Sequence, residues 1–391
     1  MIFNFNNTNI LTEKLFDIEK YTEYQIELIR TFCQEGPQFF KIISQEKLPE
    51  LIKKTISEYY KPEDVNETAI IRSVMWLMDM LIKQMKTKNE EEIINFRQNV
   101  MDVLCDHAKI FDNDPIVNED PYYKTIIIPK QTIGNHSLEY QSYKPYEVFP
   151  YDMGINYLDL SIPQVGFFTK EFKYPAITKD KKQEWMTITP NEIYTMRKHI
   201  QDAHGKVLTL GLGMGYYAFM VSEKSSVESV TVIESSQEII DLFNEYILPQ
   251  FPNKQKITII NGDAFDYMEN LEDGKYDICF ADIWDGVFDN IPYLKLKSIC
   301  NRFSLTQISY WIEEGFLQNI KSKISRQICL EGYNYLRLLP QIEYENLNDK
   351  YVETMLKQEI ISTPENIDRL LKTDIIKQLI GKVDYQKINT A

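Results

Sequence analysis

Four short apolar runs in the middle of the chain each lead directly into residue types that can bind a ligand. Glycines let a backbone pass close to a ligand, and carboxylates accept hydrogen bonds from hydroxyl groups. The residues that follow the four runs are Gly211, Gly213 and Gly215, then Glu234, then Asp263, and finally Asp282. This arrangement indicates a binding site assembled from the ends of several neighbouring segments.

The apolar runs alternate with segments of helical character between Lys206 and Ala281. The expected strands are 207–210, 230–233, 257–260 and 276–281, and the expected helices between them are 216–223, 236–248 and 265–270. Fully apolar strands that alternate with helices are typical of a parallel sheet covered on both faces. In such a sheet ligands bind at the carboxyl ends of the strands, where the glycines and acids stand.

Glu234 lies 23 positions beyond Gly211, close to the spacing at which an acid meets ribose hydroxyls in dinucleotide-binding folds. By itself a glycine-rich turn also serves ordinary connections, and a lone acid at a strand end is usually only solvated. The occurrence of such features after all four strands favours a nucleotide-like ligand over an ordinary turn.

The flanking regions differ in character from this segment. Apolar residues at helical spacing, such as Ile71, Val74, Met75 and Met78, predict a helical unit over 1–114. Short β-prone runs, including Thr125–Ile128 and the alternating residues Leu158, Leu160 and Ile162, predict a small β unit over 115–189. Thr189, Pro190 and Glu192 have the spacing of a capping box, which predicts that a helix begins there.

The fold class expected is α/β, with a doubly wound, mainly parallel sheet over 190–315 and a helical region over 316–391. A further strand is expected at Gln307–Trp311, and no clear strand pattern follows it. We therefore expect a shortened sheet, or helices in place of the last strands.

The composition limits the partners. With 58 acidic and 43 basic residues the formal charge is −15, which disfavours broad binding to nucleic acid. No stretch has the length and apolarity of a membrane span, and the first residues lack a secretory signal, so we expect a cytoplasmic protein. The 5 cysteines are scattered and never form C-x-x-C. We therefore expect reduced thiols and no metal site.

The quoted segments resemble the class I S-adenosylmethionine-dependent methyltransferases. VLTLGLGMG resembles their first motif, VTVIES their acidic second strand end, IINGDAFDYM their adenine-binding segment, and YDICFADIWDG their fourth-strand motif. The resemblance implies that S-adenosyl-L-methionine is the cofactor. The implied contacts are the methionine part beside Gly211, Gly213 and Gly215, the ribose on Glu234, the adenine on Asp263 and the Ala264 amide, and a further contact at Asp282.

A second likeness concerns Asp282 and Asp285, which have the D-x-x-D spacing of spermidine-synthase-like aminopropyltransferases. There the resemblance implies that paired acids bind an amine and remove its proton, the step needed before the amine attacks a sulfonium carbon. The alternative is that Asp285 only caps a turn. Met214 stands where those enzymes commonly carry an acid, and Thr209 stands where most methyltransferases carry one.

We therefore expect methyl transfer from S-adenosylmethionine to a small-molecule or protein acceptor, with Asp282 and Asp285 as candidate catalytic residues. Aminopropyl transfer to a cationic amine is one alternative, and a non-catalytic cofactor-binding protein is another. A nicotinamide dehydrogenase is disfavoured because its fingerprint is G-x-G-x-x-G, whereas here Tyr216 occupies the third glycine position. The acceptor and the oligomeric state do not follow from the sequence.

Overall fold

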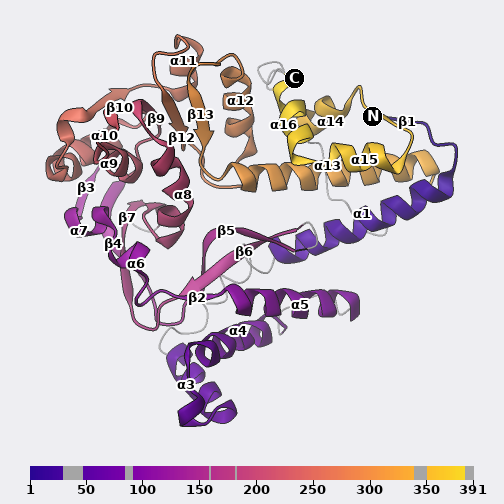
Figure 1. Cartoon of the computed structure of the whole chain (residues 1–391), viewed down its shortest axis with the longest axis horizontal. Coiled ribbons are helices and arrows are strands. Elements are labelled where there is room, and N and C mark those ends of the chain that lie inside the picture. The colour runs from indigo at the N-terminus through magenta and orange to yellow at the C-terminus, as the bar shows by residue number, and fades with distance from the viewer. Residues whose placement is uncertain (30–46, 84–90, 158–159, 181–182, 339–349, 384–391) are drawn as a thin grey trace. The chain divides into compact units, whose positions relative to one another are not determined.

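The chain forms two compact units in the computed structural model, which describes residues 1–29, 47–83, 91–157, 160–180, 183–338 and 350–383 (Figure 1). The larger unit comprises 28–264 and 276–282, and the smaller unit comprises 1–27, 265–275 and 283–391. Each unit therefore combines segments that are distant in the sequence. The division into four consecutive segments at 114, 189 and 315 stays a prediction.

The larger unit contains four strands of the expected parallel sheet. Its strands are β9 (Gly205–Leu210), β10 (Val227–Glu234), β11 (Ile257–Asn261) and β12 (Ile278–Ala281), all paired in parallel. The sheet order is β11-β10-β9-β12-β13, where β13 is Gln307–Tyr310, so within the described residues the sheet has five strands. This order, with β9 in the centre, confirms the doubly wound fold class.

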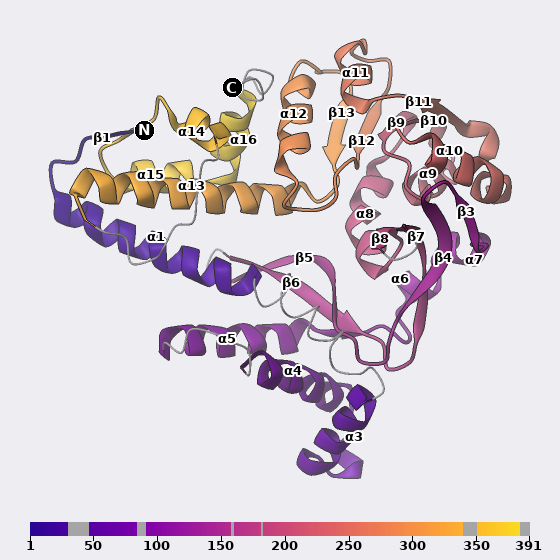
Figure 2. The ribbon, with the colours of Figure 1, turned by 180° about the vertical axis from the view of Figure 1, so that it is seen from behind.

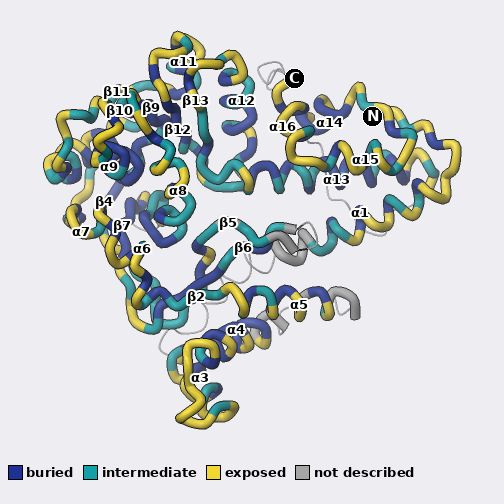
Figure 3. Tube along the Cα trace, in the orientation of Figure 1, coloured by how far each residue is buried: buried dark blue, intermediate teal, exposed yellow. Residues whose placement is uncertain are grey.

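The central strand β9 is apolar because both of its faces are covered. Val207, Leu208 and Leu210 are fully buried, and Val207 lies in register with Val230 and Ile278 on the two neighbouring strands. Figure 3 shows β9, β10 and the helix α9 (Tyr216–Ser222) as largely buried segments. The core of the sheet thus lies directly under the glycine turn.

The helices near this sheet begin where the sequence predicts. The capping box at Thr189 starts α8 (Pro190–Asp202), and the Ser236 side chain caps the first turn of α10 (Gln237–Leu242). After α10 the chain continues without a break through a π turn (Phe243–Ile247) and a 3-10 turn (Leu248–Gln250), and a second 3-10 turn (Lys254–Lys256) precedes β11. The segment α11 (Ala264–Glu269) follows β11.

Two small sheets precede the parallel sheet in the larger unit. One has the order β2-β6-β5 and the other the order β3-β4-β7-β8. Their strands are β2 (Lys109–Ile110), β3 (Gln131–Ile133), β4 (His136–Tyr143), β5 (Phe149–Tyr157), β6 (Leu160–Phe167), β7 (Phe172–Lys179) and β8 (Gln183–Thr187). Ile162 lies on β6 as the alternation predicts, whereas Leu158 falls outside the described residues.

The prediction of a short β strand at Thr125–Ile128 is wrong. Two short helices, α6 (Pro115–Asn118) and α7 (Pro121–Thr125), precede or end at its first residue, and 126–128 form neither helix nor strand. Each helix begins at an aspartate whose side chain accepts a backbone N–H, followed directly by a proline. Asp114 and Asp120 are therefore N-caps. After α7 the Ile127 N–H and carbonyl bond the Gln250 side chain, and the Ile128 N–H donates to the Tyr140 hydroxyl, so side chains take the place of a partner strand.

The helical character expected for the first part of the chain is confirmed in the described residues. The larger unit contains α3 (Lys47–Tyr59), a 3-10 turn (Pro62–Asp64), α4 (Glu67–Lys83) and α5 (Glu91–His107). On α4 the residues Val74, Met75 and Met78 are buried, as their spacing predicts for a core-facing stripe.

The smaller unit is mainly helical. Figures 1 and 2 show α1 (Thr8–Ile29) running beside the long helix α13 (Glu313–Leu336), and the side chains of Leu15 and Phe16 meet Gly332 and Tyr333 across this contact. Short strands β1 (Ile2–Phe3) and β14 (Ile360–Ile361) pair in parallel. The remaining helices are α12 (Asn290–Cys300), α14 (Lys350–Leu356), α15 (Pro364–Leu370) and α16 (Thr373–Gly381). Among the described helices, none combines the length and apolarity needed to cross a membrane.

Candidate functional site

Three strand ends meet at one edge of the parallel sheet, and backbone hydrogen bonds fix them in register. The Gly211 N–H donates to the Ile233 carbonyl at 2.9 Å, and the Asp282 N–H donates to the Leu210 carbonyl at 2.9 Å. The glycine turn after β9 therefore lies between Glu234, which ends β10, and Asp282, which follows β12. The adjacency that the sequence predicts for these residues is found in the fold.

The glycine turn depends on backbone conformations that other residues avoid. The φ angles of Gly211, Gly213 and Gly215 are 93°, 53° and 75°, all in the left-handed region. A Cβ added to Gly213 would lie 3.7 Å from the Sδ of Met186, so β8 passes close to the turn. The open side of the turn can thus accept a flat or extended ligand against bare backbone.

A substitution at Gly215 tests this requirement. A Cβ added there would lie 2.2 Å from Cε2 of Phe243, and the φ of 75° is itself unfavourable for alanine. We expect Gly215→Ala to lower the free energy of unfolding by about 2–4 kcal/mol, the sum of left-handed strain and overpacking.

Urea unfolding followed by circular dichroism measures this change. Gly262→Ala is the matched control, because its Cβ would meet only Ile233 Cγ2 at 3.9 Å. Equal unfolding midpoints for the two variants would contradict the prediction.

Glu234 is a buried carboxylate directed at the glycine turn, with only 7% of its surface exposed. Its Oε2 accepts the Leu212 N–H at 3.0 Å, and its Oε1 accepts the Ser236 N–H at 2.8 Å. These two bonds orient the carboxyl group at the edge of the sheet. Each oxygen retains a further lone pair for a hydroxyl group.

Asp263 and Ala264 follow the end of β11, which pairs directly with β10. Asp263 is exposed and Ala264, the first residue of α11, is buried. Both belong to the larger unit, together with the glycine turn, Glu234 and Asp282. The residues that the resemblance assigns to cofactor contacts are thus at the ends of adjoining strands in one compact unit.

Asp285 belongs to the smaller unit, where it is exposed and donates its backbone N–H to the Asp289 carboxylate at 3.5 Å. Its assignment as the second catalytic acid stays a prediction.

Asp282 has an unusual electrostatic environment, and the sequence did not indicate its cause. Burial and the nearby carboxylate of Glu192 raise the pKa of Asp282 to about 8. Glu192 itself accepts hydrogen bonds from the Thr189 N–H at 2.7 Å and the Thr187 hydroxyl at 3.0 Å, and burial raises its pKa. The sequence identifies Glu192 only as a helix cap, and its local spacing contains no sign of the second role.

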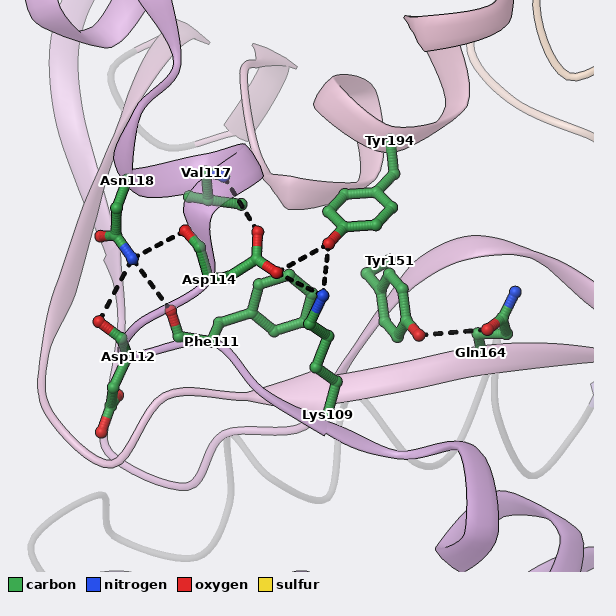
Figure 4. A network of polar contacts seen from close by, with 9 residues as sticks. All are labelled: Lys109, Phe111, Asp112, Asp114, Val117, Asn118, Tyr151, Gln164 and Tyr194. Atoms are coloured by element: carbon green, nitrogen blue, oxygen red, sulfur yellow. Dashed lines mark hydrogen bonds and ion pairs between the residues drawn. The ribbon is translucent and has the colours of Figure 1, made fainter. Parts of the chain in front are cut away.

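A polar network holds the helix that carries Glu192. In Figure 4, the side chains of Lys109, Asp114 and Tyr194 converge, with 2.6 Å from Lys109 Nζ to the Tyr194 hydroxyl and 2.8 Å from that hydroxyl to Asp114. Burial alone would raise the pKa of Asp114, but hydrogen bonds from Lys109 and Tyr194 outweigh burial and lower it. Tyr194 lies on α8 two residues after Glu192, so this network anchors the first turns of the helix that carries Glu192.

Residues 186–354 match the sequence profile of the spermine/spermidine synthase domain family. That segment has a spermidine-synthase-like form of the class I S-adenosylmethionine-dependent methyltransferase fold. The match covers the sheet strands, the glycine turn and the acids that follow β10, β11 and β12, but less than half of the chain. A search among curated proteins found no match.

Solved structures with some likeness include two kinds of transferase. The spermidine synthase from Thermotoga maritima is 16% identical, with a TM-score of 0.29, over 41% of this chain and 60% of that one. The SAH-bound Podospora anserina methyltransferase PaMTH1 is 15% identical, with a TM-score of 0.28, over 40% of this chain and 73% of that one. The chain thus spans less than two thirds of the Thermotoga enzyme, and with such TM-scores we base no conclusion on these structures.

Proposed function

We propose that this protein transfers a methyl group from S-adenosylmethionine to an acceptor that is bound beside Asp282. The observation that carries the proposal is the buried carboxylate of Glu234, held by two backbone N–H groups at the edge of the glycine turn. Burying a polar group is costly unless its hydrogen-bonding capacity is used, and the two carboxyl oxygens have lone pairs beyond those that the two N–H groups engage. The hydroxyls of a ribose fit this requirement.

The residues around Glu234 also fit the other parts of the cofactor. The bare backbone of Gly211 and Gly213 leaves room for the methionine part, while Asp263 would accept from the adenine amino group and the Ala264 amide would donate to the ring. When bound, the sulfonium supplies an activated methyl carbon. The protein would contribute alignment of the acceptor and exclusion of water.

Asp282 is suited to the acceptor side of the reaction. A carboxyl group with a pKa of about 8 is partly deprotonated near that pH, and its deprotonated form binds a proton strongly enough to take one from an amine or a hydroxyl group. Glu192 keeps this affinity high, because its negative charge opposes a second one nearby. Together the two acids would form an acidic environment that favours a nitrogen nucleophile which arrives protonated.

Aminopropyl transfer is the second candidate, favoured by the match of residues 186–354 to the spermine/spermidine synthase domain. Aminopropyl transfer would use the same glycine turn, the same neighbouring acids and the same proton acceptor, Asp282. Against it, the position where such enzymes commonly carry an acid is occupied by Met214, which is buried with 3% of its surface exposed. Methyl transfer requires no carboxylate at that position, and we therefore place it first.

Parallel titration distinguishes these functions. We expect calorimetry to detect binding of S-adenosylmethionine at micromolar concentrations, weaker binding of its decarboxylated form, and no heat with NAD. Tight binding of only the decarboxylated form would replace methyl transfer by aminopropyl transfer, and binding of NAD alone would contradict both.

Turnover then separates an enzyme from a binding protein. Incubation with a panel of amines and a cell extract as acceptor source is expected to yield S-adenosylhomocysteine. Formation of methylthioadenosine from the decarboxylated cofactor would instead indicate aminopropyl transfer. Binding without either product would support the non-catalytic alternative.

A further inference from the structure

A short segment between β2 and β3 reaches the glycine turn through buried hydrogen bonds. The Tyr122 hydroxyl, on α7, donates to the carbonyl of Met214 at 2.7 Å, although the two residues are 92 positions apart. The residues next to Tyr122 and Met214 in the sequence give no indication that these two groups form a hydrogen bond. Tyr122 is fully buried and Met214 is 3% exposed, so water does not compete for this bond.

A second bond joins the same two segments. The Tyr216 hydroxyl donates to the Asp120 carboxylate at 2.8 Å, and the other oxygen of Asp120 accepts the Tyr123 N–H as the N-cap of α7. Burial raises the pKa of Asp120. The Tyr122 ring also packs against the rings of Tyr216 and Phe219, with centroid distances of 5.6 and 5.4 Å. The segment thus forms hydrogen bonds with Met214 and Tyr216, the residues on both sides of Gly215.

We propose that Asp120 and Tyr122 form a clamp that positions the glycine turn for its ligand. The turn needs such support because glycine is the residue with the largest conformational freedom to lose on ordering. A carbonyl held by the Tyr122 hydroxyl fixes the plane of the peptide between Met214 and Gly215. The free protein then holds the turn in its binding conformation, and less ordering remains when the ligand arrives.

This inference rests on the proposed function for the identity of the ligand, but the clamp itself does not. Tyr122 touches no reacting atom and is a positioning residue. The segment from Asp120 to Tyr122 would therefore determine affinity for the cofactor rather than the chemical step. Its effect is expected in the Kd and KM for S-adenosylmethionine, with kcat little changed.

The test compares Tyr122→Phe with Tyr123→Phe in the full-length protein. Tyr123 is the neighbouring control, since it is half-buried and its hydroxyl also donates to a backbone carbonyl, but that carbonyl belongs to Ile188, outside the turn. Hydrogen exchange of peptides covering 211–218 is measured without ligand, calorimetry gives the Kd for S-adenosylmethionine, and thermal unfolding gives the overall stability.

We expect Tyr122→Phe to speed exchange in these peptides and to weaken binding by about three- to tenfold, the loss expected for one buried hydrogen bond. Tyr123→Phe is expected to change neither. Tyr216→Phe, which removes the second bond, is expected to speed exchange in the same peptides.

Unchanged exchange in both Tyr122→Phe and Tyr216→Phe would overturn the clamp, as would an equal loss of affinity in Tyr122→Phe and Tyr123→Phe at equal thermal stability. If the unsubstituted protein binds no S-adenosylmethionine, the proposed function fails, and the exchange measurements still decide the clamp.

Discussion

Asp282→Asn is expected to lower the rate of acceptor turnover by about 10²–10⁴-fold, the usual contribution of a positioned general base. Asparagine has nearly the same shape but cannot take a proton. The Kd for S-adenosylmethionine should change much less than the turnover, because the proposed ribose and adenine contacts lie at the ends of other strands. Steady-state kinetics with a saturating acceptor, together with calorimetry of the cofactor, measure the two effects separately.

The pH dependence follows from the raised pKa of Asp282. Below a pKa of about 8 the carboxyl group holds a proton and cannot accept another, so the rate should rise with pH until it levels off above that value. Glu192→Gln removes the neighbouring charge, so the midpoint of this profile should move to lower pH. Glutamine still completes a capping box, and α8 therefore keeps its start.

The same pKa has a consequence for stability. Because the folded-state pKa of about 8 exceeds the ordinary value of 3.8, the folded protein binds this proton more tightly than the unfolded chain. The associated stabilisation is complete below pH 3.8 and is lost as the pH rises through about 8. Asp282→Asn removes this loss, so the variant should be the more stable protein near pH 8.

Asp241→Asn serves as the control for both measurements, because Asp241 is exposed on α10. If Asp282→Asn retains full turnover, Asp282 is not the proton acceptor. Asp285→Asn, examined in the same way, tests the second acid of the D-x-x-D spacing, and an effect as large as that of Asp282→Asn would support a paired-acid mechanism.

Glu234→Ala is expected to weaken binding of S-adenosylmethionine by about 10²-fold, the loss of two hydrogen bonds from hydroxyl groups to a charged acceptor. The substitution also removes the acceptor for the Leu212 and Ser236 N–H groups, which loosens the turn. Calorimetry measures the affinity.

Glu228→Ala is the matched control for this substitution, because Glu228 lies on the same strand but is exposed. An unchanged affinity in Glu234→Ala would show that the ribose does not bind at this strand end. Asp263→Ala provides the same test for the adenine.

Most strands of the sheet, and the residues that follow them at one edge, could be predicted from the local sequence. Strands that are buried on both faces must be continuously apolar, so 207–210 and 230–233 stand out, and the helix starts are marked by caps such as Thr189. The glycines are informative because their positive φ angles leave few alternatives to glycine. Once the strands are known to be parallel, the residues after them must share an edge.

Local sequence fails where two signals compete or where a partner is distant. At Thr125–Ile128 the β-prone residues gave a wrong prediction, because Thr125 ends a helix and the backbone of Ile127 and Ile128 bonds the distant side chains of Gln250 and Tyr140 instead of a strand. The strands β1 and β14 were not predicted, since each has only two residues and forms by pairing with the other. A strand this short has no periodicity of its own.

The sequence alone therefore determined the edge of the sheet at which the glycine turn and the acids Glu234, Asp263 and Asp282 lie at neighbouring strand ends. Only the tertiary structure decided what surrounds it. It placed Glu192 where its charge acts on Asp282 and bonded the Tyr122 hydroxyl to a carbonyl 92 residues away. The physical reason is the range of the interactions along the chain. Neighbouring residues largely set the backbone conformation, whereas electrostatic coupling and buried hydrogen bonds depend on which distant segments the fold brings together.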